Sequence, residues 1–166
     1  MNKYGISDIN HFGVLKVSLP LVLIFAFLTR HWWLSLGVMM SRSPGVMGDF
    51  FDGSVTYFLV AEFPALLVCA MALNRKPTAG KFIRAVWKQG LWLLSVSVLL
   101  NLALIVLLPT KAALLLNKVI VDLSQLDGAQ WGSIAVNVAI IAYFVFSTRT
   151  RDTFAEFPSP PDDLKP

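Results

Sequence analysis

Four long runs of apolar residues alternate with shorter polar stretches along the chain. The runs cover about residues 17–40, 55–73, 91–108 and 131–148. Each is close to the roughly 17–25 residues that a helix needs to cross the hydrocarbon core of a bilayer. Lipid offers the backbone no hydrogen-bond partner, and the runs lack the strict alternation of barrel strands, so we expect helices. The pattern therefore predicts an all-α integral membrane protein, a four-helix bundle.

The polar stretches predict the rest of the organisation. Residues 1–16 form an N-terminal arm, residues 17–148 the membrane domain, and residues 149–166 a proline-rich tail that we expect to be flexible. Residues 112–126 are apolar on one side only and predict an amphipathic outer segment between spans 3 and 4, either on the interface or packed on the bundle. We expect the first run to be one continuous helix, rather than two short helices or a cleaved signal peptide.

The lysines and arginines lie mostly on one side of the predicted spans. Ten of the 14 fall in the arm, in the connection between spans 2 and 3, and in the tail, whereas three fall in the other two connections. Because cytoplasmic loops carry an excess of Lys and Arg, both termini are expected to be cytoplasmic. Only 14% of residues are charged, against about 25% in soluble domains, so a topology signal explains this positive charge better than nucleic-acid binding does.

One basic cluster begins the third predicted span. Lys81, Arg84 and Lys88 share a helical face at the cytoplasmic surface. Attraction to anionic lipid is worth about 1 kcal/mol for each basic residue there, so these three are candidate anionic-lipid contacts. A topology signal alone also accounts for them.

Each predicted span carries one strongly polar residue in its outer half. From the helical rise, Arg30 lies ~15 Å from the outer end of its span, and Glu62, Asn101 and Asn137 lie ~10 Å from theirs. An unpaired charge in mid-membrane costs at least ~2.5–3.5 kcal/mol, and Glu62 is the one acid in a span, which makes it the natural partner of Arg30. His31 is about 100° from Arg30 around a helix and is expected to meet a different neighbour or a water pocket.

Two interpretations of this buried polar layer stay open. In the first, an ion pair bracketed by amides fixes the register of the helices. In the second, the layer forms a pocket for a ligand, an ion or a proton. Motifs of catalysis are not evident, and His11 and His31 alone do not form a metal set. We therefore expect neither a cofactor nor enzymatic activity.

The N-terminal third carries a recognisable pattern of residues. It consists of Tyr4, Asp8, Gly13, Leu15 and Lys16, then an apolar run, Arg30 and Trp32, and finally Ser41 and Arg42. This pattern resembles the YfeZ-like family of uncharacterised bacterial inner-membrane proteins. The motif covers roughly the first half of the chain, and the remainder is similar by hydropathy only. Val17 stands where the family has proline, which is delayed here to Pro20. The resemblance implies a multi-pass inner-membrane protein and no particular activity.

Two functions from different classes follow. The first is an accessory or scaffold subunit that acts by association in the bilayer, within a larger membrane complex or a homo-oligomer. The alternative is a binder or carrier of a small molecule, ion or lipid that uses the layer around Arg30 and Glu62. A stable protein partner would favour the first function. A retained ligand, or an open cavity that reaches Arg30, would favour the second.

Overall fold

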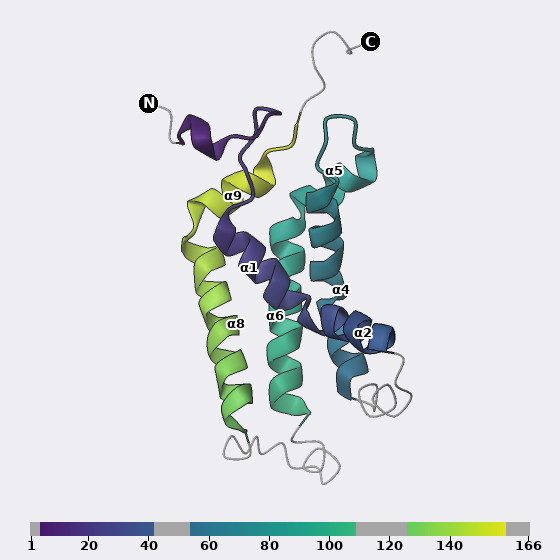
Figure 1. The fold of residues 1–166 in the computed structure, drawn as a ribbon. Helices are drawn as coiled ribbons and strands as arrows, with labels where there is room; N and C mark the ends of the chain where they lie inside the picture. The colour runs from purple at the N-terminus through teal and green to yellow at the C-terminus, as the bar shows by residue number, and fades with distance from the viewer. Residues whose placement is uncertain (1–3, 42–53, 109–125, 159–166) are drawn as a thin grey trace.

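The computed structural model describes residues 4–41, 54–108 and 126–158, and within these ranges the chain is helical (Figure 1). A single isolated bridge between Ile9 and Leu15 is the only strand-like pairing in the described ranges. The elements, in chain order, are a 3-10 helix at Ile6–Asp8 and helices α1 (Leu19–Leu28), α2 (Arg30–Ser41), α4 (Ser54–Leu73), α5 (Lys81–Lys88), α6 (Gly90–Leu107), α8 (Gly128–Phe146) and α9 (Thr148–Ala155).

Three long apolar helices stand side by side and form the body of the molecule. Segments Val55–Leu73, Gly90–Leu107 and Gly128–Phe146 are each long and apolar enough to cross a membrane. They correspond to the predicted spans 2, 3 and 4, with ends that differ by up to three residues. Helix α6 lies between α4 and α8 and packs against both, so it forms the centre of the bundle (Figure 1). The predicted amphipathic segment 112–126 lies, except for Leu126, outside the described residues.

The first apolar run is broken at Thr29. Helix α1 ends there, where the Thr29 N–H and hydroxyl both donate to the Phe25 carbonyl, at 3.0 and 2.7 Å. A threonine hydroxyl that bonds four residues back competes with the backbone and favours a bend. Helix α2 starts at the next residue and leaves at 58° to α1. Trp33 of α2 donates its indole N–H to the same hydroxyl at 2.9 Å, which fixes the corner.

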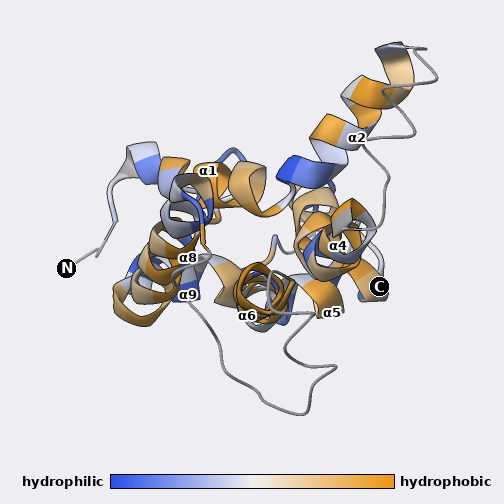
Figure 2. Ribbon diagram, turned by 90° about the horizontal axis from the view of Figure 1, so that it is seen from below, coloured by the Kyte–Doolittle hydropathy of each residue, from blue (hydrophilic) through white to orange (hydrophobic). Residues whose placement is uncertain are grey.

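The expectation of one continuous helix over residues 17–40 is therefore wrong. Together the two helices are long and apolar enough for one span, so the described residues hold three straight candidate spans, or four if this bent pair counts as one. The ten residues of α1 rise about 15 Å, roughly half of a hydrocarbon core. Seen from below, α2 extends away from the other helices (Figure 2).

The N-terminal arm, α5 and α9 gather at one end of the bundle (Figure 1). Tyr4 donates to Asp152, and Arg149 pairs with Asp8 at 2.9 Å, so the first and last described segments are joined. Residues Arg149 to Ala155, at the start of the predicted tail, belong to α9. Ser147 caps this helix by accepting a hydrogen bond from the Thr150 N–H. The prolines of the tail lie after the helix, from Pro158 onward, so they do not prevent it.

Candidate functional site

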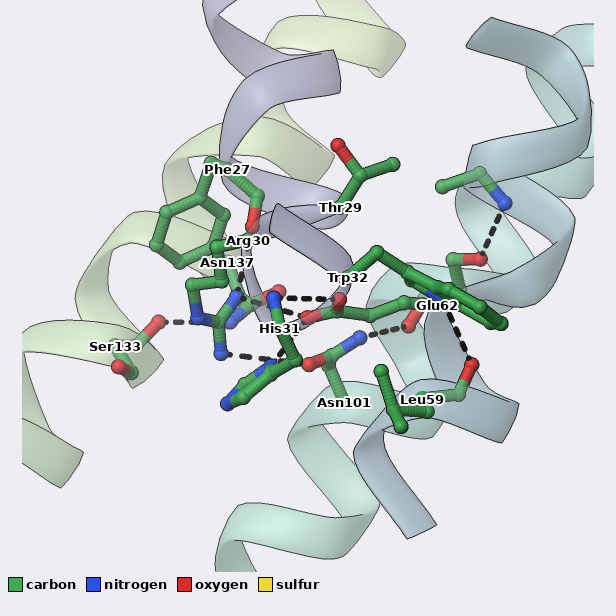
Figure 3. Close-up of polar contacts among 12 residues, drawn as sticks. Phe27, Thr29, Arg30, His31, Trp32, Leu59, Glu62, Asn101, Ser133 and Asn137 are labelled. Atoms are coloured by element: carbon green, nitrogen blue, oxygen red, sulfur yellow. Dashed lines mark hydrogen bonds and ion pairs between the residues drawn. The ribbon is translucent and has the colours of Figure 1, made fainter. Parts of the chain in front are cut away.

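Glu62 of α4 is the centre of a polar cluster at the corner between α1 and α2 (Figure 3). Its side chain is fully buried. The Nδ1 atom of His31 lies 2.6 Å from Glu62 Oε1, and the His31 backbone N–H donates to Oε2 at 3.1 Å. The first backbone N–H groups of a helix have no partner within the helix, and the positive end of the helix dipole favours a negative charge there. Glu62 therefore caps α2 from a neighbouring helix.

Arg30 approaches the same carboxylate less closely. Its Nη1 lies 3.6 Å from Glu62 Oε1, so the structure brings together the ion pair that the sequence suggested. The guanidinium also donates to the Phe27 carbonyl at 2.9 Å, lies over the Phe27 ring, and reaches Asn101 Oδ1 at 3.5 Å. Of the two alternatives for His31, a neighbour different from that of Arg30 is wrong, since both contact Glu62, whereas the His31 side chain does line the cavity described below. Because the chain turns at Thr29, Arg30 and His31 both fall at the start of α2, where both face Glu62.

The two asparagines of the predicted layer behave differently. Asn101 of α6 is fully buried, donates to the Ser97 carbonyl at 3.0 Å and accepts from Arg30. Asn137 of α8 is also fully buried and donates to the Ser133 carbonyl at 2.8 Å. Its Oδ1, however, has no hydrogen-bond partner among the described residues. The structure thus joins α2, α4 and α6 through polar contacts and leaves Asn137 of α8 with an acceptor that no described residue uses.

A cavity of about 440 Å³ adjoins this cluster and is lined by residues at the end of α6 and at the start of α8. Its volume falls within the roughly 300–1,000 Å³ typical of small-molecule sites. The wall is polar where α2 and α8 meet it and apolar where α4 and α6 do. The polar side chains come from Arg30, His31, Asp127, Gln130 and Ser133. The apolar ones include Phe58, Leu104 and Leu108. Within the described ranges, no group of three or more His, Cys, Asp or Glu residues could hold a metal ion.

The basic residues Lys81, Arg84 and Lys88 are not equivalent in α5. Lys81 and Lys88 are exposed. Arg84 instead folds back onto its own loop, donating to the carbonyls of Ala79 at 3.1 Å and Pro77 at 2.5 Å. Its guanidinium therefore holds the turn before α5, so of the three candidate lipid contacts only the two lysines stay exposed.

Arg75, one of the basic residues in the connection between spans 2 and 3, has a structural role that the topology signal does not indicate. Arg75 is buried, stacks on Trp87, and donates to the carbonyls of Leu15 at 2.8 Å and Glu156 at 2.7 Å. Burial lowers the pKa of Arg75, and nearby Glu156 acts in the opposite direction. We call Arg75, Trp87, Leu15 and Glu156 the terminal clamp, because they hold the arm and α9 on the end of α4. Lys76, the next residue, is also basic but is exposed, so the local sequence does not distinguish the buried residue from its exposed neighbour.

A family model described as a protein of unknown function, DUF2919, matches residues 4–156. No curated protein and no solved structure is detectably similar to the chain. The match includes the arm, the polar cluster and the terminal clamp.

Proposed function

The chain belongs to the DUF2919 family of proteins of unknown function, and we propose that it is a membrane protein that binds a small molecule in the cavity beside Arg30. The observation that carries the proposal is this cavity, whose wall includes the side chains of both Arg30 and His31. A polar group placed in a membrane is costly, and a bundle needs no cavity in order to fold. The cavity therefore favours a binding role over a purely structural ion pair.

The excess of Lys and Arg at the end that holds the arm, α5 and α9 supports a cytoplasmic position for that end. With this orientation, in the inner membrane of a bacterium, the cavity faces the outer side. Both termini are then cytoplasmic, in agreement with the contact of Tyr4 and Asp152 at one end of the bundle. The proposal includes no chemical step and no cofactor, so the protein would act as a binder or carrier.

Native mass spectrometry of the protein extracted gently from membranes tests this function. We expect an adduct of small mass on the wild type, and its loss in Arg30→Gln. Arg151→Gln is the matched control, because Arg151 is exposed on α9 and lies outside the cavity. A wild type that shows no adduct, or an adduct equally present in Arg30→Gln, would contradict binding at this cavity.

Helix α2 supports a second candidate, an accessory subunit that acts by association. Trp33, Leu34 and Met40 of this helix are more than half exposed, and α2 projects from the bundle (Figure 2). A partner helix could cover these side chains, either from a second copy or from a larger membrane complex. Co-purification separates the two candidates: this role requires a stoichiometric partner that is lost in Leu34→Asn, whereas ligand binding requires none.

A further inference from the structure

The cavity beside Arg30 carries opposite charges on two of its walls. Arg30 of α2 contributes a cation and Asp127 at the start of α8 contributes an anion. Building on the proposed function, we propose that the ligand is zwitterionic: its carboxylate or phosphate pairs with Arg30, and its ammonium group pairs with Asp127. The site is then defined by the guanidinium of Arg30 and the carboxylate of Asp127, which specify the two charged groups of the ligand.

Arg30 is available to a ligand because its acidic partner is engaged elsewhere. Glu62 receives its two short contacts, 2.6 and 3.1 Å, from His31, while Arg30 stands 3.6 Å away. The guanidinium donates two hydrogen bonds to described residues, one of them long at 3.5 Å. An arginine has more N–H donors than these contacts use, in a planar fork that matches a carboxylate or phosphate. Its side chain stays 24% exposed while that of Glu62 is fully buried.

Asp127 is held rigidly by the start of α8. Its Oδ1 accepts the Gln130 N–H at 2.7 Å, and Gln130 Oε1 accepts the Asp127 N–H at 2.9 Å, which together form a capping box. The Asp127 carboxylate accepts this single hydrogen bond from the described residues, and a carboxylate has room to accept several more. Within the described part of the chain, Asp127 forms no ion pair, so its charge is open to a cationic group.

The charges select against ligands of a single sign. A simple anion at Arg30 would share the cavity with Asp127, and a simple cation at Asp127 would share it with Arg30, so each meets one repulsion. A zwitterion satisfies both groups. The apolar wall of Phe58, Leu104 and Leu108 then contacts the uncharged part of the ligand. A phospholipid with an ethanolamine headgroup and a free apolar amino acid both carry this chemistry.

Titration of the purified protein, followed by native mass spectrometry, tests the inference. The lipid arm compares phosphatidylethanolamine with phosphatidylglycerol, which lacks the ammonium group, and the soluble arm uses leucine. We expect at least one zwitterion to bind about tenfold more tightly than phosphatidylglycerol. If only phosphatidylethanolamine binds, the site recognises a lipid headgroup. If only leucine binds, the site recognises a free amino acid.

The variant Asp127→Asn separates the charge from the fold. Asparagine caps a helix about as well as aspartate, so α8 should stay intact while the cationic subsite is lost. We expect the preference for the zwitterion to vanish in Asp127→Asn and to persist in Asp8→Asn, the matched control at the other end of the bundle. Asp127→Lys should invert the preference toward phosphatidylglycerol.

Failure of this inference is distinguishable from failure of the proposed function. If the adduct from membranes disappears in Arg30→Gln but is unchanged in Asp127→Asn, the cavity binds a ligand that is not zwitterionic, and the inference is overturned alone. Equal affinity of the wild type for phosphatidylglycerol and for the preferred zwitterion also overturns it. Absence of every adduct overturns both.

Discussion

Glu62 should be coupled energetically to His31 more strongly than to Arg30, although an arginine is the expected partner of a buried acid. The variants are Glu62→Leu, His31→Leu and Arg30→Leu, alone and in the two pairs that contain Glu62. Glu62→Leu removes the acceptor of the His31 ring, of the His31 N–H and of the Arg30 guanidinium together. Breaking a buried charged pair from one side costs about 3–5 kcal/mol, so this single variant should be the most damaging.

The distances set the expected couplings. The His31 ring and Glu62 are 2.6 Å apart, which is the distance of a strong hydrogen bond. A hydrogen bond to a charged group is worth about 1.5–3 kcal/mol in soluble proteins. Hydrogen bonds measured within a membrane protein reach about 1.7 kcal/mol. We therefore expect about 1.5 kcal/mol for His31. The 3.6 Å contact of the partly exposed Arg30 should give about 1 kcal/mol or less.

Unfolding by SDS in mixed micelles measures these free energies, and double-mutant cycles isolate the pairwise part. The double variant of His31 and Glu62 should recover part of the loss of the single variants, because donor and acceptor disappear together. His11→Leu is the control, since this histidine is exposed in the arm and should change little. A coupling of Arg30 with Glu62 that equals or exceeds that of His31 would refute the reasoning from the geometry.

The opposite end of the bundle gives three further expectations. Gly90→Ala should lower the free energy of unfolding by about 1–3 kcal/mol, because the added methyl overlaps the Phe154 ring; SDS unfolding measures this. Arg75→Lys should lower it by about 1.5–3 kcal/mol and expose the arm to proteases, because an ammonium cannot reproduce the fork that reaches several carbonyls. Arg149 holds the pKa of Asp8 below its ordinary 3.8, so their pair stabilises the arm fully above that value and is lost as pH falls through the lower pKa; the protection of the arm against hydrogen exchange, measured relative to the intrinsic rate at each pH, should fall only in that acid range, and Asp8→Asn should remove this dependence.

Matched controls accompany these variants. Gly132→Ala adds a methyl to a helix where nothing lies within 4 Å, so it should be neutral or stabilising by up to about 1 kcal/mol. Lys76→Arg changes an exposed neighbour of Arg75 and should leave the arm protected. Equal effects of Gly90→Ala and Gly132→Ala would contradict the described packing. Protection of the arm that is already lost near neutral pH, relative to the intrinsic exchange rate, would contradict the described ion pair.

Much of the fold could be predicted because hydropathy is a local property. The three straight candidate spans need only a long apolar run, because in lipid such a run would have to be helical. The polar layer was also predictable in part, since Arg30, Glu62 and Asn101 are each costly alone and each needs a partner at the same depth. Their assembly follows from depth and face, which the sequence contains.

The break at Thr29 could not be predicted from the local sequence, because part of its stabilisation is tertiary. Threonine is common within membrane helices and by itself gives no stop signal. Besides the contacts of the Thr29 hydroxyl, the buried Glu62 carboxylate stabilises the break by capping the new helix from α4. The same break moves His31 into contact with Glu62. The structural role of Arg75 could not be predicted for a related reason. A basic residue at the end of a span is also expected as a topology charge, and the carbonyls that Arg75 binds come from segments near both ends of the chain.

The terminal clamp has a consequence for the order in which the chain can assemble. Arg75 contacts Leu15 and Glu156, which are 60 and 81 residues away, and Tyr4 contacts Asp152 across 148 residues. Helices α4 and α6, by contrast, are close in sequence and can pair as a hairpin as soon as both have emerged. Contacts of long sequence separation form slowly because loop closure must precede them. The contacts of the arm with α9 can therefore form only after synthesis has passed Glu156, and we expect them to form last.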